Sequence, residues 1–292
     1  MSTKMNCPLC HSNNHRQVPH TSYLQCEQCT IQFPIESPLT GVVTNQYPKS
    51  PTGRGTRLAR SQAKLVKKIS SKSKFIDLGC GNGEFLYALS QGSIPSDSIS
   101  GVELDSQSID AARKAGMSVA TEIPAGVTNT TVTLWHVAEH IEPQKLIEIL
   151  TQISEGNNEL VISVPNGDSI SWLRYQEAFS FFDPVSHVTQ FTSISLENLL
   201  AKANWRIVSK YRTPWYGIFN AIQTALNLTR PRNELYELLK RKKSIPSPSI
   251  LVASVFGLIL NLFPMMRMLI AEISISSSSS LTILAVPTKV NR

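Results

Sequence analysis

Hydrophobic and polar positions alternate along the middle of the chain in a way that predicts strands and helices in turn. Short apolar runs typical of buried strands are separated by amphipathic stretches with helical spacing. The expected strands are 74–78, 99–103, 117–120, 131–135, 159–164, 205–212 and 281–286, and the expected helices are 53–70, 83–91, 106–115, 142–154 and 193–203. This alternation predicts an α/β fold with a mainly parallel sheet and helices on both faces.

The N-terminal residues 1–34 have a different pattern, because they contain two Cys-x-x-Cys pairs separated by fifteen residues. The pairs are Cys7 with Cys10 and Cys26 with Cys29. Their spacing is typical of a four-cysteine zinc ribbon. About 30 residues cannot bury a sufficient core, so the metal would supply the folding free energy. Four thiolates leave no coordination position for water, and we therefore expect a structural Zn²⁺ ion.

Proline and low-complexity segments divide the rest of the chain. Residues 35–52 are proline-rich and indicate a linker, and residues 53–212 are expected to form the α/β core. Residues 213–275 have another character and are expected to be a helical insertion. Residues 276–292 would add the final strand and a tail.

The insertion contains the apolar run 250–263, with Arg241-Lys242-Lys243 before it and Arg267 after it. Three interpretations are open. The run is a helix packed over the sheet as a lid, an interfacial helix with peripheral membrane contact across 241–267, or a membrane span. Its shortness and its flanking prolines disfavour the span.

The net charge of +7 conceals a strong asymmetry along the chain. The net charge is +9 over residues 1–74, −12 over 75–200 and +10 over 201–292. Either these segments neutralise one another, or the basic ends face an anionic partner such as a nucleotide-linked substrate, a membrane surface or nucleic acid. The polar N-terminus lacks a signal-peptide pattern, and the cysteine usage indicates a reducing compartment. We expect a cytoplasmic protein that can also bind peripherally to the inner face of the membrane.

A glycine-rich turn follows the first strand of the core and gives the strongest indication of chemistry. The strand ends at Asp77, and the pattern D-x-G-x-G-x-G continues through Gly79, Gly81 and Gly83. A dinucleotide fingerprint would need a glycine at position 84, where the chain has glutamate. Such a turn lets the backbone approach a bound ligand closely. The carboxylate suits a ligand with a cationic amino group better than a pyrophosphate, and S-adenosylmethionine (SAM) is such a ligand.

Polar residues also follow the second and fourth strands. Glu103 comes 20 residues after Gly83, at a strand end where its carboxylate can accept both hydroxyls of a ribose. The fourth strand is followed by Glu139 and His140, which can serve as a general base near neutral pH. The alternative is that this pair only caps or braces the next helix. His187, in a later loop, is either a structural histidine or a second acceptor contact or base.

These motifs resemble the class I SAM-dependent methyltransferases. The resemblance covers residues 74–212 and the closing strand. The segment Trp-His-Val-Ala-Glu-His-Ile at 135–141 points to the branch of quinone O-methyltransferases and of methyltransferases for surface polysaccharides and deoxysugars. It implies a Rossmann-like seven-stranded sheet, here with an N-terminal zinc ribbon and a helical C-terminal insertion.

The resemblance also implies roles for single residues. Asp77, Gly79, Gly81 and Gly83 would hold the methionine part of SAM, Glu103 the ribose, and Asp105 and His136 the adenosine side. Glu139, His140 and His187 would be the catalytic residues beside the acceptor. Some quinone O-methyltransferases have a metal-associated glutamate four residues before the motif histidine. This chain has His136 there, which argues against a divalent metal.

The resemblance leaves the acceptor open. The expected substrate is a small-molecule or a lipid- or nucleotide-linked acceptor, such as a sugar of surface-glycan biosynthesis or a quinone-like phenol. A nucleic-acid-modifying or nucleic-acid-binding protein is the rival class, because a zinc ribbon beside a basic helix can bind RNA or DNA. The ribbon lacks interleaved basic and aromatic residues, and no Asn-Pro-Pro-Tyr-like motif follows the fourth strand, so this class is disfavoured. The complete glycine turn disfavours a non-catalytic module.

Overall fold

The structure is a computed structural model that describes residues 5–35, 57–92, 94–234 and 247–288, with the side chains of 214–216 left out. Almost all of the predicted linker 35–52 and the basic run Arg241-Lys242-Lys243 lie outside the described residues.

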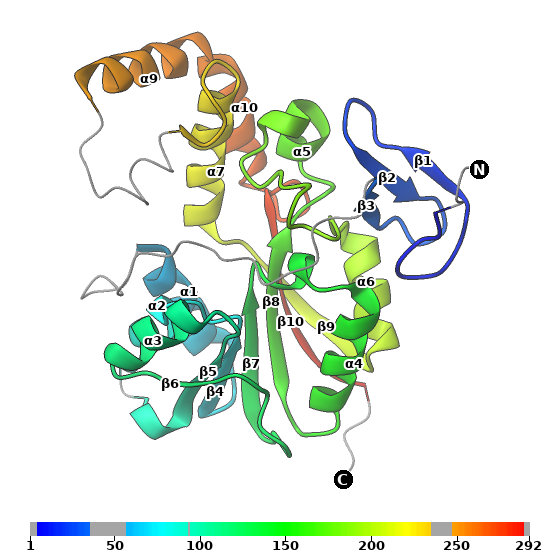
Figure 1. Ribbon diagram of the computed structural model, residues 1–292, viewed down its shortest axis with the longest axis vertical. Coiled ribbons are helices and arrows are strands. Elements are labelled where there is room, and N and C mark those ends of the chain that lie inside the picture. The colour runs from blue at the N-terminus through cyan, green and yellow to red at the C-terminus, as the bar shows by residue number, and fades with distance from the viewer. Residues whose placement is uncertain (1–4, 36–56, 93, 235–246, 289–292) are drawn as a thin grey trace.

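A seven-stranded sheet forms the centre of the molecule, with the strand order β6-β5-β4-β7-β8-β10-β9. The five strands from β6 to β8 are parallel, whereas β10 runs antiparallel to both of its neighbours (Figure 1). The strands are β4 (Lys74–Leu78), β5 (Ile99–Val102), β6 (Ser118–Ala120), β7 (Thr130–Trp135), β8 (Glu159–Pro165), β9 (Trp205–Tyr211) and β10 (Ser280–Pro287). The predicted α/β fold and its seven strands are thus confirmed.

Two hydrophobic cores lie on the two faces of this sheet. One contains the buried leucines of α4 and α6 packed on strand residues such as Ile76 and Leu134. The other contains the apolar faces of α1, α2 and α3 packed on Phe75 and Ile99. Neighbouring residues Phe75 and Ile76 face opposite cores, as the strand pleat requires. The helices are α1 (Arg57–Ile69), α2 (Glu84–Ser90), α3 (Ser106–Lys114), α4 (Pro143–Ser154), α5 (Ile170–Tyr175) and α6 (Ser193–Lys202), with 3₁₀ turns η1 (Ser96–Ser98), η2 (Ala138–His140) and η3 (Gln176–Ala178).

The last strand, β10, is inserted between β8 and β9, although β9 comes before it in the chain by almost 70 residues. Ile283 lies opposite Ile162 of β8 on one side and Lys210 of β9 on the other. Nearly all of β10 is buried. The apolar pattern of 281–286 explains why it forms a strand, and its burial on both faces explains its central place.

The N-terminal segment forms a small sheet of β1 (His15–Gln17), β2 (Tyr23–Cys26) and β3 (Gln32–Pro34). It packs directly against the α/β core. Gln32 and Gln190 exchange backbone hydrogen bonds of 3.1 and 2.8 Å, and the hydroxyls of Thr30 and Thr192 are 2.6 Å apart. The side chain of Phe33 belongs to the same hydrophobic core as α4 and α6. The segment therefore shares the main core, which agrees with its being too short to form one alone.

Among its described residues, the C-terminal insertion has the helices α7 (Pro214–Asn227), α9 (Pro248–Leu260) and α10 (Leu262–Ala271). The axes of α9 and α10 differ by 71° at Asn261. Helix α9 packs on α7 and α10 and points away from the sheet (Figure 1). This placement differs from the interpretation of 250–263 as a lid over the sheet. Among the described residues, no single helix has the length and hydropathy of a membrane span, and only the bent pair of α9 and α10 has them together.

Candidate active site

The glycine turn after β4 has the backbone conformation that its sequence predicts. The φ angles of Gly79, Gly81 and Gly83 are +68°, +53° and +80°, in the left-handed region that favours glycine. The Gly79 N–H donates to the Val102 carbonyl at 2.8 Å. A Cβ atom at position 79 would lie 2.5 Å from Val137 Cγ2. The turn is therefore packed between the ends of β5 and β7 and leaves no space for a side chain at Gly79.

Asp77, the last polar residue of β4, is buried with 3% of its surface exposed. Its Oδ1 accepts a hydrogen bond of 2.5 Å from Thr133 Oγ1 of β7. Burial and, to a smaller extent, the charge of Glu103 raise the pKa of Asp77 to about 8, against the effect of this hydrogen bond. A cationic group beside the carboxyl would favour its ionised form. The residue thus fits the amino group of a ligand such as SAM.

Glu103 follows β5 directly, and three backbone amides hold its carboxylate. Oε2 accepts from the Gly81 N–H at 2.8 Å, and Oε1 accepts from the N–H groups of Leu104 at 2.7 Å and Asp105 at 3.0 Å. These bonds fix the carboxylate beside the glycine turn. The lone pairs that remain can accept from the hydroxyls of a ribose, as the sequence predicts.

The Asp105 side chain caps helix α3, because its Oδ2 accepts from the Ser108 N–H at 2.8 Å. This bond accounts for an aspartate at that position. The predicted contact of Asp105 with adenosine stays a prediction.

His136 follows β7 with a φ angle of +55°. Its Nδ1 is 3.3 Å from Glu139 Oε1, and its Nε2 is 3.4 Å from the Ser280 hydroxyl of β10. Its ring centroid is 4.8 Å from that of Phe181. The structure thus places His136 beside Glu139 and β10, and its predicted contact with adenosine stays a prediction.

Glu139, His140 and His187 are brought together from η2 and from the loop before α6. Their ligand atoms all lie within 4.8 Å of one another. The Glu139 carboxylate is 1% exposed. Burial opposes its ionisation, but the hydrogen bond and charge of His136 and the charges of His140 and His187 hold its pKa below the usual value. Burial lowers the pKa of His187 to about 4, so its imidazole is neutral at pH 7.

The contact of His140 with Ser186 sets the tautomer of the imidazole. His140 Nδ1 is 3.0 Å from the Ser186 carbonyl oxygen, which can only accept a hydrogen bond. The hydrogen of the neutral ring therefore lies on Nδ1, and Nε2 carries the free lone pair. One carboxylate and two imidazoles are also a donor set that can hold a divalent metal ion.

Sequence reasoning missed three residues of this region: Thr133, Phe181 and Ser280. Thr133 has a signal, because it is a polar residue between Val132 and Leu134 in a buried strand, and strand pairing sets it opposite Asp77. Phe181 and Ser280 come from distant segments without a local pattern that marks them.

The four N-terminal cysteines form a second cluster, and all of them are free of disulfides. The Cys7 and Cys29 sulfurs are 3.4 Å apart, and those of Cys10 and Cys26 are 3.5 Å apart. All four ligand atoms lie within 4.8 Å of one another. A disulfide would need about 2.05 Å, whereas sulfurs at the corners of a tetrahedral zinc site lie roughly 3.8 Å apart, given Zn–S bonds of about 2.3 Å. The cluster therefore fits a four-thiolate zinc ion.

Comparison with known proteins decides the family of the chain. A family model described as a methyltransferase domain matches residues 52–210, which is more than half of the chain. The chain belongs to this methyltransferase family. No curated protein sequence matches it.

Several solved structures are similar to this methyltransferase. A SAM-dependent methyltransferase from Archaeoglobus fulgidus has 21% sequence identity and a TM-score of 0.47, with 80% of this chain and 95% of that chain covered. The cyclopropane synthase MmaA2 from Mycobacterium tuberculosis has 11% identity and a TM-score of 0.48, with 77% and 82% covered. The CcbJ methyltransferase from Streptomyces caelestis has 10% identity and a TM-score of 0.47, with 87% and 97% covered.

The expected class of enzyme is confirmed: the chain is a class I SAM-dependent methyltransferase with a Rossmann-like sheet. The roles of single residues stay predictions.

We expect the methyltransferase to bind zinc through the four cysteines and to depend on it for stability. Cys26→Ser should lose most of the zinc and about 3 kcal/mol of the free energy of unfolding, because the ribbon shares the main core. Elemental analysis and urea unfolding measure the two effects. Cys80→Ser is the matched control, since Cys80 lies in the glycine turn and should keep the zinc. A wild-type protein that binds no zinc would contradict this prediction.

We expect the affinity for S-adenosylhomocysteine (SAH) to rise with pH, because its cationic amino group favours the ionised form of Asp77. In the free protein the pKa of this carboxyl is raised to about 8, so binding below that pH releases a proton. The dissociation constant should fall up to roughly tenfold per pH unit from pH 6 to 8 and then level off. Isothermal titration calorimetry measures this dependence.

Asp77→Asn should remove this pH dependence and weaken SAH binding at pH 8.5. Adenosine, which lacks the amino acid part, is the control ligand, and its affinity should change little with pH or with the substitution. Equal pH dependence for both ligands would show that Asp77 does not contact the amino group.

Proposed function

We propose that this enzyme methylates a hydroxyl group of a small-molecule or of a lipid- or nucleotide-linked acceptor, with His140 as the general base. A sugar of surface-glycan biosynthesis or a quinone-like phenol is the proposed acceptor. The observation that carries the proposal is the contact between His140 Nδ1 and the Ser186 carbonyl oxygen, which leaves Nε2 free to take a proton.

The residues at the carboxyl ends of β4 and β5 fit SAM. Asp77 would pair with its amino group, and the backbone of Gly79, Gly81 and Gly83 allows close approach to the methionine part. Glu103, already oriented by three amides, would accept from the ribose hydroxyls. Asp105 and His136 would border the adenosine. When bound, SAM supplies a methyl group on a positively charged sulfur, so the protein contributes mainly positioning.

Of the three catalytic candidates, His140 is best suited to be the base. Glu139 is a weak base, because the neighbouring imidazoles lower its pKa. Its carboxylate is also buried. His187 is also a weak base, because burial lowers its pKa to about 4. His140 is only partly buried and is held by one nitrogen. As it takes the acceptor's proton, the ionised carboxylate of Glu139 stabilises the imidazolium that forms.

His187 would act as a positioning residue. Its ring packs edge-on against that of His140, with 4.7 Å between the centroids. Together with the Ser186 carbonyl, this contact restricts the rotation of the His140 ring. A neutral His187 also adds no positive charge that would oppose protonation of His140.

The charge pattern of the chain supports an anionic or membrane-associated acceptor at the cytoplasmic face of a membrane. The catalytic middle of the chain is acidic, whereas both ends are strongly basic. Phosphate groups of a nucleotide-linked or lipid-linked acceptor are complementary to these basic ends.

We expect His140→Gln to lower kcat by roughly 10²- to 10⁴-fold while the affinity for SAH stays within twofold, because the base acts only on the acceptor. Transfer of radiolabelled methyl from SAM to lipid-linked sugars, nucleotide sugars and phenols identifies an acceptor and measures kcat. Glu142→Gln is the matched control, since Glu142 is exposed and follows His140 by two residues in the sequence, and it should keep full activity.

Unchanged kcat in His140→Gln would contradict the role of the base. Loss of activity with a chelator and its return with Mg²⁺ or Mn²⁺ would instead assign the cluster of Glu139, His140 and His187 to a metal. Absence of SAH binding in the wild-type protein would overturn the proposed function as a whole.

A further inference from the structure

Helix α9 buries mainly small and polar residues, with Leu258 partly buried beside them, and exposes most of its large apolar side chains. The residues that it and its C-cap bury against the insertion are Ser254, Gly257 and Asn261. By contrast, its large apolar side chains are exposed, with Phe256 61% and Val252 69% accessible to water. A surface helix of a water-soluble domain has the opposite arrangement.

Specific contacts fix this orientation. Asn261 Nδ2 donates to Thr229 Oγ1 at 3.0 Å and to the Gly257 carbonyl at 2.9 Å. A Cβ atom at position 257 would lie 2.9 Å from Thr229 Oγ1, so the glycine permits the close contact. Turning the apolar side inward would break these contacts. The exposure of these apolar side chains is therefore fixed by the packing of the insertion.

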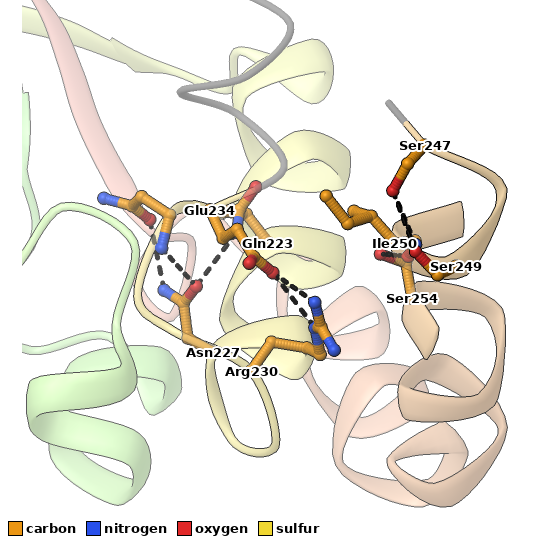
Figure 2. A network of polar contacts seen from close by, with 9 residues as sticks. Gln223, Asn227, Arg230, Glu234, Ser247, Ser249, Ile250 and Ser254 are labelled. Carbon is orange, nitrogen blue, oxygen red and sulfur yellow. Dashed lines mark hydrogen bonds and ion pairs between the residues drawn. The ribbon is translucent and has the colours of Figure 1, made fainter. Parts of the chain in front are cut away.

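The end of α7 is also held firmly to the rest of the protein. Asn227 Nδ2 donates to the Ala178 carbonyl at 2.9 Å, and Asn233 Nδ2 donates to the Ser180 carbonyl at 3.3 Å. Within α7, Asn227 Oδ1 accepts from Gln223 Nε2 at 2.9 Å. Arg230 and Glu234 form an ion pair just beyond, and Figure 2 shows these contacts at the end of α7 and a separate group of contacts at the start of α9. Helix α9 thus rests on an anchored support.

The apolar surface continues past the bend into α10. It is formed by Val252, Val255, Phe256, Ile259 and Leu260 of α9 and by Phe263 of α10, each between 58% and 77% exposed. We call these six residues the apolar face. At 100° per residue, its α9 members and the 41% exposed Leu251 cover about half of the helix circumference.

Charge also distinguishes a lipid partner. The only charged residue in 247–271 is Arg267, which is exposed on α10. In the sequence, the four consecutive cations of 240–243 precede α9, outside the described residues. Apolar side chains accompanied only by cations are complementary to the surface of an anionic bilayer.

We propose that the apolar face is a membrane docking surface that inserts into the interfacial layer of an anionic lipid bilayer. Helices α9 and α10 lie in the plane of the interface, since the 71° bend and the exposed Arg267 oppose a span. The proposal does not depend on the identity of the methyl acceptor. It goes beyond methyl transfer by giving the protein a second binding partner.

Flotation with extruded vesicles tests the proposal on the full chain. The vesicles are phosphatidylcholine alone or with a quarter of phosphatidylglycerol, at 50 and 500 mM NaCl. We expect wild-type protein to bind the anionic vesicles at low salt. The variant Phe256→Glu with Phe263→Glu should bind at least tenfold more weakly. Ile194→Glu is the matched control, since Ile194 is 57% exposed on α6, and it should bind like the wild type.

Circular dichroism and SAH binding confirm that the double variant is folded. Failure of wild-type protein to bind anionic vesicles at low salt would overturn the proposal, as would wild-type binding by the folded double variant. Sedimentation without lipid gives a further arm. If the wild-type protein is a dimer that does not bind vesicles and the double variant is a monomer, the apolar face makes the contact between two copies. That result would also overturn the proposal. Failure here leaves SAH binding and methyl transfer measurable, so the two proposals are tested separately.

Discussion

The parallel hydrogen bonding of β4 between β5 and β7 is the constraint on which the site depends. Its register sets Asp77 directly opposite Thr133 and brings the carboxyl ends of the three strands to one edge of the sheet. The glycine turn, Glu103 and the segment with His140 all start from this edge. A slip of one residue would turn Thr133 to the other face and leave the buried carboxyl of Asp77 without its hydrogen bond.

The site contains two buried carboxyl groups, Asp77 and Glu139, whose pKa values are shifted in opposite directions by their surroundings. Asp77 is next to a neutral hydroxyl and the negative Glu103, so burial dominates and its pKa is raised. Glu139 is equally buried, but three imidazoles surround it and its pKa is lowered. Burial alone would protonate both carboxyls. The Asp77 carboxyl would therefore be ionised more readily beside a cationic ligand, whereas the imidazoles around Glu139 already favour its ionised form.

The features of the fold that depend on a local sequence pattern could be predicted from the sequence. The features that depend on the order of the strands or on the orientation of a helix could not. All seven strands and the glycine turn follow from apolar runs and from the spacing of Gly79, Gly81 and Gly83. The contact of His136 with Ser280 was not predictable, because it requires β10 to lie beside β8, and no local signal sets that order. The apolar run 250–263 was compatible with both a packed and an interfacial helix, and the packed lid was the favoured interpretation. Its orientation depends on small polar residues such as Asn261, whose partner Thr229 is remote in the sequence.

The N-terminal four-cysteine segment, called the ribbon here, and the insertion both contact the segment 166–192, which carries His187. The ribbon holds this segment from one side, through Gln32 with Gln190 and through the aromatic contact of Tyr23 with Trp172 at 5.4 Å. On the other side, Thr224 Oγ1 of α7 accepts from the Ser180 N–H at 3.2 Å. The segment that carries His187 is thus held near both ends by the ribbon and in its middle by α7. Because Ser186 and His187 contact His140, disturbance of the ribbon or of the insertion would reach the proposed base without touching the residues that are proposed to hold SAM.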